Sequence, residues 1–416
     1  MQIDKLSLHN FRCFEHLELE FPERFTLLLG DNGAGKTALI EALRIAAGAF
    51  LLGVEVVQSL YIQSTDIRER ITPDNLGSVI EPPQIQVYAP AEVRAEGWLD
   101  GQHINWRRYS KRGGRQQAAG GAAEISRIAG KMAKERSEDA KPLLPLLAYY
   151  PAKRLAASRV DPVERTMPPD RWERGYEGAL DATLNQTRQL RWIRSVTFSE
   201  LQQGISSPLL ASALNAVANC LEGYSRVIYS VQLEELVAMD EAGRQQRARL
   251  LSEGYWTMLM MVLDMAYRCT VLNPHLGENV LRDTPGVVLI DELDLHLHPR
   301  WQQRVVRDLQ TAFPRIQFIA TTHSPLIGAS LPSSCLYHLE GDEAGRFHAR
   351  QYAENTFGLS PDQMLAGSYF DLISDRPLAA QEQLSDLAQR VDAGDGEAAI
   401  EFLRKLNTGL EASKPR

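Results

Sequence analysis

Residues 25–43, FTLLLGDNGAGKTALIEAL, decide the fold of this chain. The stretch opens with five β-forming residues, breaks at Gly30, and continues from Lys36 as a helix with an apolar stripe. The octapeptide Gly30–Thr37 matches the pattern G-x-x-x-x-G-K-[ST] in full. Its glycines let the backbone wrap closely around phosphates, whose charge the loop N–H groups and the helix N-terminus stabilise. The stretch therefore predicts a nucleotide phosphate site, with Lys36 on the β- and γ-phosphates and Thr37 on Mg²⁺.

Composition and charge narrow the class of protein. The chain has 416 residues, of which 44% are hydrophobic and 24% charged, the balance of a soluble globular protein with one large or two to three modest domains. The net charge is −8, but residues 94–159 carry 14 Lys and Arg against 6 Asp and Glu, whereas residues 353–416 carry 6 against 11. The basic segment is suited to nucleic-acid phosphates, and the acidic tail is better suited to a protein partner.

Cysteine usage and the start of the chain indicate the compartment. The four cysteines are far apart and form no C-x-x-C pair, which favours buried thiols in a reducing cytosol over a disulfide framework or a zinc site. The first residues, MQIDKLSLHNF, have a strand pattern and do not resemble a signal peptide. No uncharged apolar run approaches the ~20 residues of a membrane span. We therefore expect a cytoplasmic protein with no membrane partner.

The rest of the chain predicts a mixture of strands and helices. Two antiparallel strands, near residues 5–8 and 17–21, precede the strand of the phosphate loop. Residues from about 60 to 115 have a mixed β pattern. Helices are expected at residues 122–138, through most of 180–224 and at 255–271, and further strands at 143–150, 226–231, 234–239, 286–290 and 318–321.

Three later motifs complete a candidate nucleotide site. The sequence LSEG at 251–254 opens a helix with a hydroxyl and N–H groups suited to an anion, although alone it also fits a simple helix N-cap. The sequence GVVLIDE at 286–292 reads as a buried parallel strand ending in two acids. Asp291 can then hold Mg²⁺, and Glu292 can act as the general base on the attacking water. Another buried strand ends at His323, which can contact the γ-phosphate or that water.

His296 and His298 form an H-x-H pair in the sequence LHLHP. Such a pair can ligate a metal ion, but no further ligands stand at obvious zinc spacing. We therefore expect this segment to be a loop that passes a dimer interface.

The order of these motifs resembles that of ATP-binding cassette (ABC) ATPases of the SMC/RecF-like branch. Residues 30–37 match the family's Walker A motif, 251–254 its signature, 289–292 its Walker B motif, and His323 its switch histidine. Asn10-Phe11-Arg12 resembles the branch's N-F-R segment, whose arginine lies near the nucleotide. The resemblance implies an α/β fold: an ABC-type P-loop ATPase with a mixed sheet covered by helices on both faces, a β lobe and a helical insertion, and no long coiled coil.

The resemblance also implies site residues and cofactors. ATP and Mg²⁺ would be bound between two protomers, with the signature residues acting on the partner's nucleotide. Glu292 and His323 are the expected catalytic residues, and Thr37 and Asp291 the expected Mg²⁺ ligands. The expected nucleotide-binding residues are Asn10, Arg12, Asn32, Gly33, Ala34, Gly35, Lys36, Thr37, Ala38 and Asp291, and the expected signature residues are Ser252, Glu253 and Gly254. The Q-loop glutamine is not unambiguous; Gln63 is the candidate, with Asp66 and Arg68 nearby.

A narrower resemblance joins the chain to the PtuA-like ATPases of bacterial antiviral Septu and retron systems. It rests on LIDELDLHLHPRWQQ, TTHSPL, the helix that begins with LSEG, the segment 149–155 and the tail segment 356–365. In that family the ATPase scaffolds or restrains a separate HNH nuclease. The resemblance implies an ATPase that dimerises on ATP and controls a nuclease or toxin effector, without cutting nucleic acid itself.

The domain organisation follows from the motif positions. We expect a split ABC core at residues 1–60 and 245–345, and a β lobe with a helical insertion at 61–244 that includes the basic segment 94–159. Residues 346–416 would form an acidic helical segment for partner binding.

Three other classes of protein share some of these features. A RecF-like DNA-repair ATPase that clamps duplex DNA is favoured weakly by the basic segment, which leaves DNA or RNA as a possible partner. A nuclease with a Toprim domain is disfavoured because only about 70 residues follow the cassette and no D-x-D and Glu cluster stands on a strand. A transporter cassette is disfavoured by the 214 residues between Thr37 and Leu251.

Overall fold

The structure is a computed structural model that describes residues 1–54, 57–71, 85–111, 121–138, 140–152, 171–181, 186–342, 345–370, 378–392 and 395–408. The chain divides into two compact units, Met1–Gly358 and Leu359–Arg416. Parts of the predicted basic segment, residues 112–120, 139 and 153–159, lie outside the described residues, as do residues 153–155 of the PtuA-like segment.

A six-stranded sheet carries the phosphate loop. Its strand order is β15-β14-β3-β13-β12-β8. The strands are β3 (Phe25–Leu29), β8 (Leu146–Tyr150), β12 (Gly286–Ile290), β13 (Ile316–Thr321), β14 (Leu336–Gly341) and β15 (Phe347–Arg350). All are parallel except β15, which runs antiparallel to β14. Every residue of β3, β8, β12 and β13 is buried, because layers on both faces cover these strands, and this explains their apolar runs.

A second, antiparallel sheet has the order β2-β1-β6-β7. Its strands are β1 (Gln2–Phe11), β2 (Phe14–Glu20), β6 (Ala91–Leu99) and β7 (Gln102–Ser110). Burial alternates along β6 and β7, as expected for a sheet with one covered face. The pairing of β1 with β2 confirms the predicted N-terminal strand pair. This sheet joins strands from both sides of the predicted boundary at residue 60.

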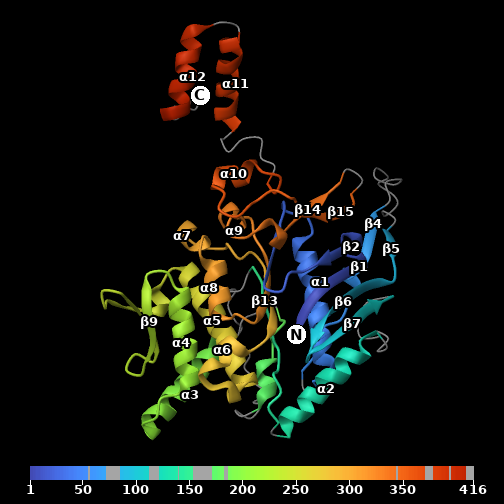
Figure 1. The fold of residues 1–416 in the computed structure, drawn as a ribbon, viewed down its shortest axis with the longest axis vertical. Coiled ribbons are helices and arrows are strands. Elements are labelled where there is room, and N and C mark those ends of the chain that lie inside the picture. The colour runs from blue at the N-terminus through green and yellow to red at the C-terminus, as the bar shows by residue number, and fades with distance from the viewer. Residues whose placement is uncertain are drawn as a thin grey trace, which may run out of the picture. The chain divides into compact units, whose positions relative to one another are not determined.

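Helix α1 (Lys36–Gly48) lies between the two sheets, in contact with β12 and β13 of one and with β1, β6 and β7 of the other. Ten of its thirteen residues are buried, including the apolar stripe expected from the sequence. In Figure 1, α1 lies on one side of β13, and α5 (Glu253–Leu272) and α8 (Val305–Ala312) lie on the other side. The mixed sheet with helices on both faces confirms the predicted fold class.

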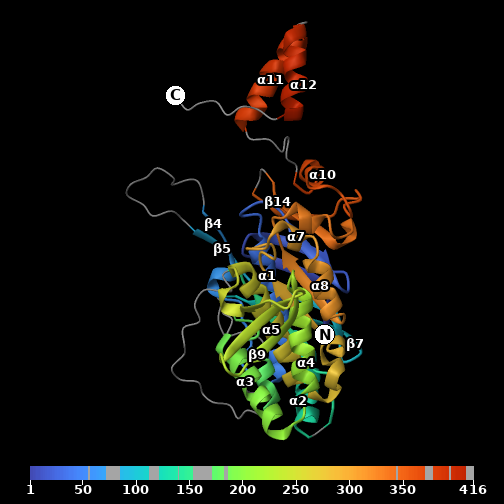
Figure 2. The ribbon, with the colours of Figure 1, turned by 90° about the vertical axis from the view of Figure 1, so that its left-hand side faces the viewer.

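The insertion after α1 supplies smaller elements, and helices also flank the later strands. A two-stranded ribbon pairs β4 with β5, and a three-stranded sheet has the order β11-β10-β9. Figure 2 shows α3, α4 and α5 close together beside β9. The elements are β4 (Arg68–Ile71), β5 (Ile85–Tyr88), α2 (Ala123–Ser137), α3 (Gln186–Gln203), α4 (Pro208–Cys220), β9 (Tyr224–Ser230), β10 (Glu235–Asp240), β11 (Gln245–Arg247), α6 (Val280–Asp283), α7 (Pro299–Gln302) and α9 (Pro325–Gly328). The predicted helix at 122–138 and the predicted strand pair at 226–239 are both confirmed.

The second unit contains α10 (Pro361–Ala366), α11 (Leu378–Asp392) and α12 (Gly396–Thr408). Helices α11 and α12 pack against each other. The predicted C-terminal segment begins at residue 346, but β15 belongs to the sheet of the first unit.

Three sequence-based expectations concern the chain as a whole. Among the described helices the longest is α5, with 20 residues, so the described part of the chain holds no long coiled coil. Within the described ranges, no helix combines the length and apolar character that crossing a membrane requires. All four cysteines are free; Cys220 and Cys269 are buried as predicted, whereas Cys13 and Cys335 are only partly covered.

Candidate nucleotide site

The phosphate loop connects β3 to α1 at the carboxyl edge of the central sheet. Gly30, Gly33 and Gly35 have φ values of 136°, 84° and 94°, a region that disfavours residues with a Cβ. A Cβ on Gly30 would lie 2.3 Å from the carbonyl oxygen of Leu339, and one on Gly35 would lie 2.8 Å from Cζ of Phe14. A Cβ on Gly33 would meet nothing within 4 Å. The loop is therefore packed at its two ends and open at Gly33, as a cradle for phosphate requires.

Lys36 lies across this loop. Its Nζ donates to the carbonyl oxygens of Gly30, at 2.6 Å, and Asp31, at 2.8 Å. Burial lowers the pKa of Lys36, while the negative charges of Asp291 and Asp31 act in the opposite direction. A largely buried ammonium held by two neutral carbonyls is suited to exchange those partners for phosphate oxygens.

The other phosphate-loop residues line the same turn. Asn32 and Gly33 are exposed, whereas Ala34 and Ala38 are 7% and 8% exposed. The N–H of Ala34 donates to the carbonyl oxygen of Asp31 at 3.2 Å. The N–H of Ala34 is thus engaged within the loop, whereas Ala38 lies in the first turn of α1, where N–H groups lack partners within the helix. The exposed Asn32 is placed to offer its side chain.

Asp291 lies opposite Thr37, although 254 residues separate the two in the sequence. The Thr37 hydroxyl donates to Oδ2 of Asp291 at 3.4 Å, and the Thr321 hydroxyl donates to Oδ1 at 2.6 Å. Asp291 is 7% exposed, at the end of β12. A hydroxyl and a carboxylate that converge beside a phosphate loop are oxygen donors of the kind Mg²⁺ prefers, so these residues fit that ion.

Glu292 has a backbone conformation that non-glycine residues rarely adopt. Its φ is 51°, and its N–H donates to the Thr321 hydroxyl at 2.7 Å. Strained conformations of this kind persist where surrounding contacts hold them, and they cluster at functional sites. The Thr321 side chain thus holds the two acids together, one through its carboxylate and the other through its backbone.

Asp294 organises the segment that carries His323. Its Oδ1 accepts hydrogen bonds from the Thr322 hydroxyl at 2.5 Å and from the N–H of His323 at 3.2 Å. The His323 side chain is exposed at the end of β13, the strand next to β12. The backbone of His323 is therefore fixed to the loop after the two acids, while its imidazole faces solvent.

The signature residues begin α5 and pack against the loop of the H-x-H pair. Ser252 is the N-cap residue, but its side chain makes no capping hydrogen bond and is exposed. Oε1 of Glu253 lies 3.7 Å from Nε2 of His296. A Cβ on Gly254 would lie 2.1 Å from the carbonyl oxygen of His296, so a side chain here would separate the helix from that loop.

Gly254→Ala is expected to lower the free energy of unfolding by about 1–3 kcal/mol, because the added methyl group overlaps the His296 carbonyl. The matched control is Gly130→Ala in α2, whose Cβ would lie 3.6 Å from its closest neighbour, the carbonyl oxygen of Gly53. The control is expected to gain up to about 1 kcal/mol of helix propensity. Urea unfolding of both variants measures the difference; equal stability would contradict the close packing of Gly254.

The remaining parts of the H-x-H segment have structural partners. Nδ1 of His298 accepts the N–H of Arg300 at 3.4 Å and so caps α7. Within the described ranges, no group of three or more His, Cys, Asp or Glu residues could hold a metal ion.

The N-F-R segment lies at the turn between β1 and β2. Asn10 and Arg12 both have a φ of 49°, and Nε of Arg12 donates to Oδ1 of Asp66 at 2.7 Å. Nδ2 of Asn10 lies 3.1 Å from Nε2 of His9. Gln63 is exposed, and its side-chain amide donates to the carbonyl oxygen of Tyr61 at 3.1 Å. Arg12 is therefore fixed to the segment that contains Gln63, and the Q-loop role of Gln63 stays a prediction.

Three residues that the sequence reading missed support this edge of the sheet. Thr321 and Asp294 hold the two acids and the His323 segment, as described above. Tyr149, at the end of β8, has its pKa raised to about 12, chiefly by burial and next by the charge of Asp291. The guanidinium of Arg44 lies 4.3 Å from the centre of the Tyr149 ring. The available signal for Thr321, the first residue of TTHSP, was its position as a polar residue at the end of a buried strand.

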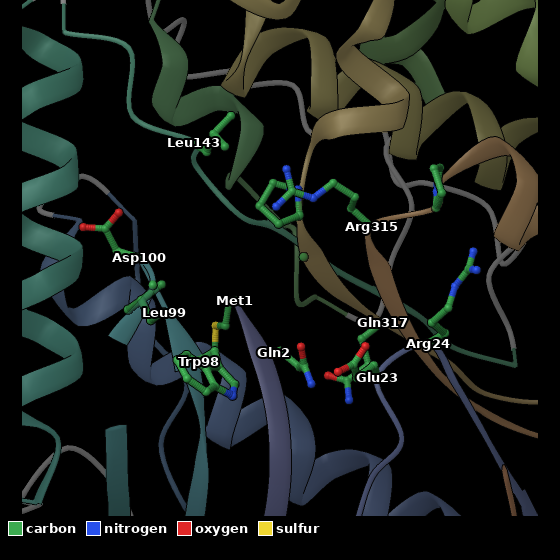
Figure 3. Close-up of a pocket in the computed structure, with 14 residues that line it drawn as sticks. Met1, Gln2, Glu23, Arg24, Trp98, Leu99, Asp100, Leu143, Arg315 and Gln317 are labelled. Atoms are coloured by element: carbon green, nitrogen blue, oxygen red, sulfur yellow. The ribbon is translucent and has the colours of Figure 1, made fainter. Parts of the chain in front are cut away.

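A separate cavity lies at the opposite, amino edge of the sheet. It has a volume of about 460 Å³ and lies where β12 and β13 begin, as its lining residues Gly286 and Gln317 show. Figure 3 shows Arg315 reaching into this space from one side and Trp98 lining the other. Because the phosphate loop is at the carboxyl edge, this cavity is not part of the nucleotide site.

Comparisons with known proteins agree with this geometry. Residues 5–207 match the family described as an AAA domain, and residues 276–329 match "AAA domain, putative AbiEii toxin, Type IV TA system". The chain is 25% identical to the retron Vc95 probable ATPase of Vibrio cholerae serotype O1 biovar El Tor, over 94% of this chain and 83% of that protein. It is 23% identical to the Septu protein PtuA of Bacillus mycoides (strain KBAB4), over 90% of this chain but only 45% of that protein.

The likeness to solved structures is weaker. The SMC head domain from Thermotoga maritima aligns with 85% of this chain and 100% of its own length, with a TM-score of 0.47 and 16% identity. The matches to ATPase families and to a retron ATPase, together with the phosphate loop and the paired acids, show an ATPase. The chain is a P-loop ATPase, similar along most of its length to the retron Vc95 probable ATPase and to a Septu protein PtuA.

Proposed function

We propose that two copies of this chain bind two ATP molecules between them and that ATP hydrolysis separates the copies. In each site, Lys36, Thr37 and Asp291 of one protomer hold the nucleotide, and Ser252 of the other protomer contacts the γ-phosphate. ATP binding then favours the closed dimer, and hydrolysis favours the open state.

The side chains have distinct roles in this proposal. Bound Mg²⁺, held by Thr37 and Asp291, would neutralise charge on the phosphates. Glu292 accepts a proton from the attacking water, and the hydrogen bond of its N–H to Thr321 fixes the backbone that carries it. His323 follows β13 on a backbone fixed by Asp294, so that its imidazole can contact the γ-phosphate or the water.

The observation that carries the proposal is the convergence of three residues beside an open glycine loop. Thr37 contacts Asp291, and Thr321 joins Asp291 to the backbone of Glu292. Structural packing alone does not require two acids, one in a strained conformation, at this position. The exposed Ser252 hydroxyl, which caps no helix, supports the second half of the site.

We further propose that the dimer controls a partner effector, an HNH-type nuclease or a toxin, in antiviral defence. The relatives named as a retron ATPase and as Septu PtuA support this assignment. Net charge gives a second argument, because residues 353–416 carry 11 acidic against 6 basic side chains, a composition suited to a protein partner.

A DNA-clamping role in the manner of RecF has weaker support. The described part of the basic segment includes Lys131 and Lys134 on α2, which lie 3.5 Å and 3.8 Å from the carboxylates of Glu135 and Glu138. These i,i+4 pairs are typical of a solvated helix face, and they reduce the positive charge available to a phosphate backbone.

Mixing two inactive variants tests whether the site is shared. Ser252→Arg is expected to remove ATPase activity because a bulky cation would block the partner's nucleotide, and Lys36→Ala to remove it through loss of phosphate binding. In a heterodimer, one site combines the intact Lys36 of the first variant with the intact Ser252 of the second. We therefore expect the mixture to hydrolyse ATP although neither variant does so alone.

The control is a mixture of Ser252→Arg with the double variant Ser252→Arg, Lys36→Ala, which contains no intact Ser252 and should stay inactive. A first mixture as inactive as this control would contradict a site completed by the partner protomer.

A further inference from the structure

A buried polar cluster connects the signature helix to the central sheet. It consists of Tyr150 at the end of β8, Gln189 on α3, and Asp264 and Arg268 on α5. All four side chains are at most 4% exposed. Burial of such a cluster costs free energy unless its members are well paired, so packing alone does not account for polar residues at these positions.

Asp264 is the centre of the cluster. Its Oδ2 accepts hydrogen bonds from the Tyr150 hydroxyl at 2.8 Å and from Nε of Arg268 at 2.8 Å. Its Oδ1 accepts from the amide of Gln189. Nη1 of Arg268 also donates to the carbonyl oxygen of Gly175 at 2.8 Å. The carboxylate thus joins helices α5 and α3 to strand β8.

A second clamp fastens the far end of the same helix to the same strand. The side chain of Asn273, which follows α5, accepts the N–H of Leu144 at 2.9 Å and donates to its carbonyl oxygen at 2.9 Å. Leu144 lies just before β8. Asp264 and Asn273, nine residues apart, therefore attach α5 to β8 and to the residue just before it.

Strand β8 in turn contacts the acid that would hold Mg²⁺. The N–H of Asp291 donates to the carbonyl oxygen of Tyr150 at 2.8 Å. The same residue, Tyr150, thus contacts Asp291 through its backbone and Asp264 through its side chain. Ser252 begins α5, 12 residues before Asp264, or about 18 Å along a helix.

We propose that Asp264, with Tyr150 and Arg268, acts as a positioning cluster that fixes the signature helix to the edge strand beside Asp291. The inference rests on the proposed function, in which Asp291 serves one nucleotide of the dimer and Ser252 serves the other. The cluster keeps the separation of these two residues constant within a protomer. The protomer then closes on its partner as one rigid body, with Ser252 already in place.

Removal of one hydroxyl group tests this role. Tyr150→Phe, in a Glu292→Gln background that holds ATP, is expected to weaken the ATP-dependent dimer about tenfold, because the signature helix loses its attachment to β8. The affinity of the monomer for nucleotide should change less than about twofold, since the phosphate loop is untouched. It is measured with a fluorescent ATP analogue at protein concentrations too low for dimers to form. The dimer dissociation constant is measured by analytical ultracentrifugation.

The matched control is Tyr176→Phe. Tyr176 is also fully buried, and its hydroxyl donates to the carbonyl oxygen of Pro145 at 2.9 Å rather than to α5. Both variants lose one buried hydrogen bond. If the Tyr150 hydroxyl only stabilises the fold, the two variants should have equal dimer affinities at a temperature well below both melting temperatures. Equal affinities would overturn the inference while leaving the proposed function intact.

A second variant removes the ion pair at the centre of the cluster without leaving a buried charge. Asp264→Leu combined with Arg268→Met replaces the ion pair with apolar side chains, a change that folded proteins often tolerate. This protein should also dimerise more weakly with ATP while it binds the nucleotide analogue normally. If the Glu292→Gln parent itself fails to dimerise with ATP, the proposed function fails, a result distinct from equal affinities of the parent and its cluster variants.

Discussion

Glu292→Gln should lower the rate of ATP hydrolysis by about 10²- to 10⁴-fold while leaving ATP binding in place. The amide has the shape of the carboxylate but cannot accept the proton of the attacking water. The contacts that hold the backbone of residue 292 do not involve the side chain, because its N–H donates to Thr321. The fold and the phosphate loop are therefore expected to be unchanged.

Phosphate release measures the rate, and binding of a fluorescent ATP analogue measures affinity. Glu69→Gln on β4 is the matched control, since Glu69 is also a glutamate and its side chain is exposed. This control should retain the activity of the unmodified protein. Normal turnover by the Glu292→Gln protein would remove Glu292 from the role of general base.

Lys36→Ala should weaken ATP binding roughly 100-fold, because two charge-assisted hydrogen bonds to phosphate oxygens are lost. The Nζ group already lies over the loop, bound to the carbonyl oxygens of Gly30 and Asp31. Those two carbonyls are backbone groups at an open loop, so water can replace the ammonium and the fold should remain. Isothermal titration with ATP and Mg²⁺ measures the affinity.

Lys5→Ala provides the control for this variant. Lys5 is a partly exposed lysine on β1 that pairs with Glu18 at 3.1 Å. Its loss should leave ATP affinity unchanged. Equal affinity of the Lys36→Ala and unmodified proteins would show that nucleotide binds elsewhere than the glycine loop.

The central strands and the phosphate loop could be predicted from sequence because their signals are local. The run of five β-forming residues before Gly30, four of them apolar, is sufficient to predict a buried strand, and the glycine spacing is sufficient to predict the loop. The two acids after residues 286–290 are also local, because the strand places whatever follows it at the same edge of the sheet.

Contacts between distant segments could not be predicted in this way. Thr321 joins Asp291 and Glu292 from 30 residues away, and nothing in its local sequence distinguishes it from Thr322. The position of β8 next to β12 follows from a crossover through α3, α4 and α5, whose path no periodicity specifies. The role of Asp264 in the middle of α5 depends on that position.

The pairing of β1 with β6 is another such case. The sequence predicts a β pattern in both regions, but not that strands from either side of residue 60 share a sheet. Tertiary hydrogen bonding decides this arrangement, since β6 offers an edge on which β1 can pair.

The central claim, that ATP joins two protomers through a shared site, is tested most directly by the mass of the Glu292→Gln protein in solution. Size-exclusion chromatography with light scattering, with and without ATP and Mg²⁺, gives that mass. We predict the 46.6 kDa of one chain without nucleotide and twice that mass with saturating ATP. A protein that binds ATP but keeps the same mass in both conditions would contradict the claim.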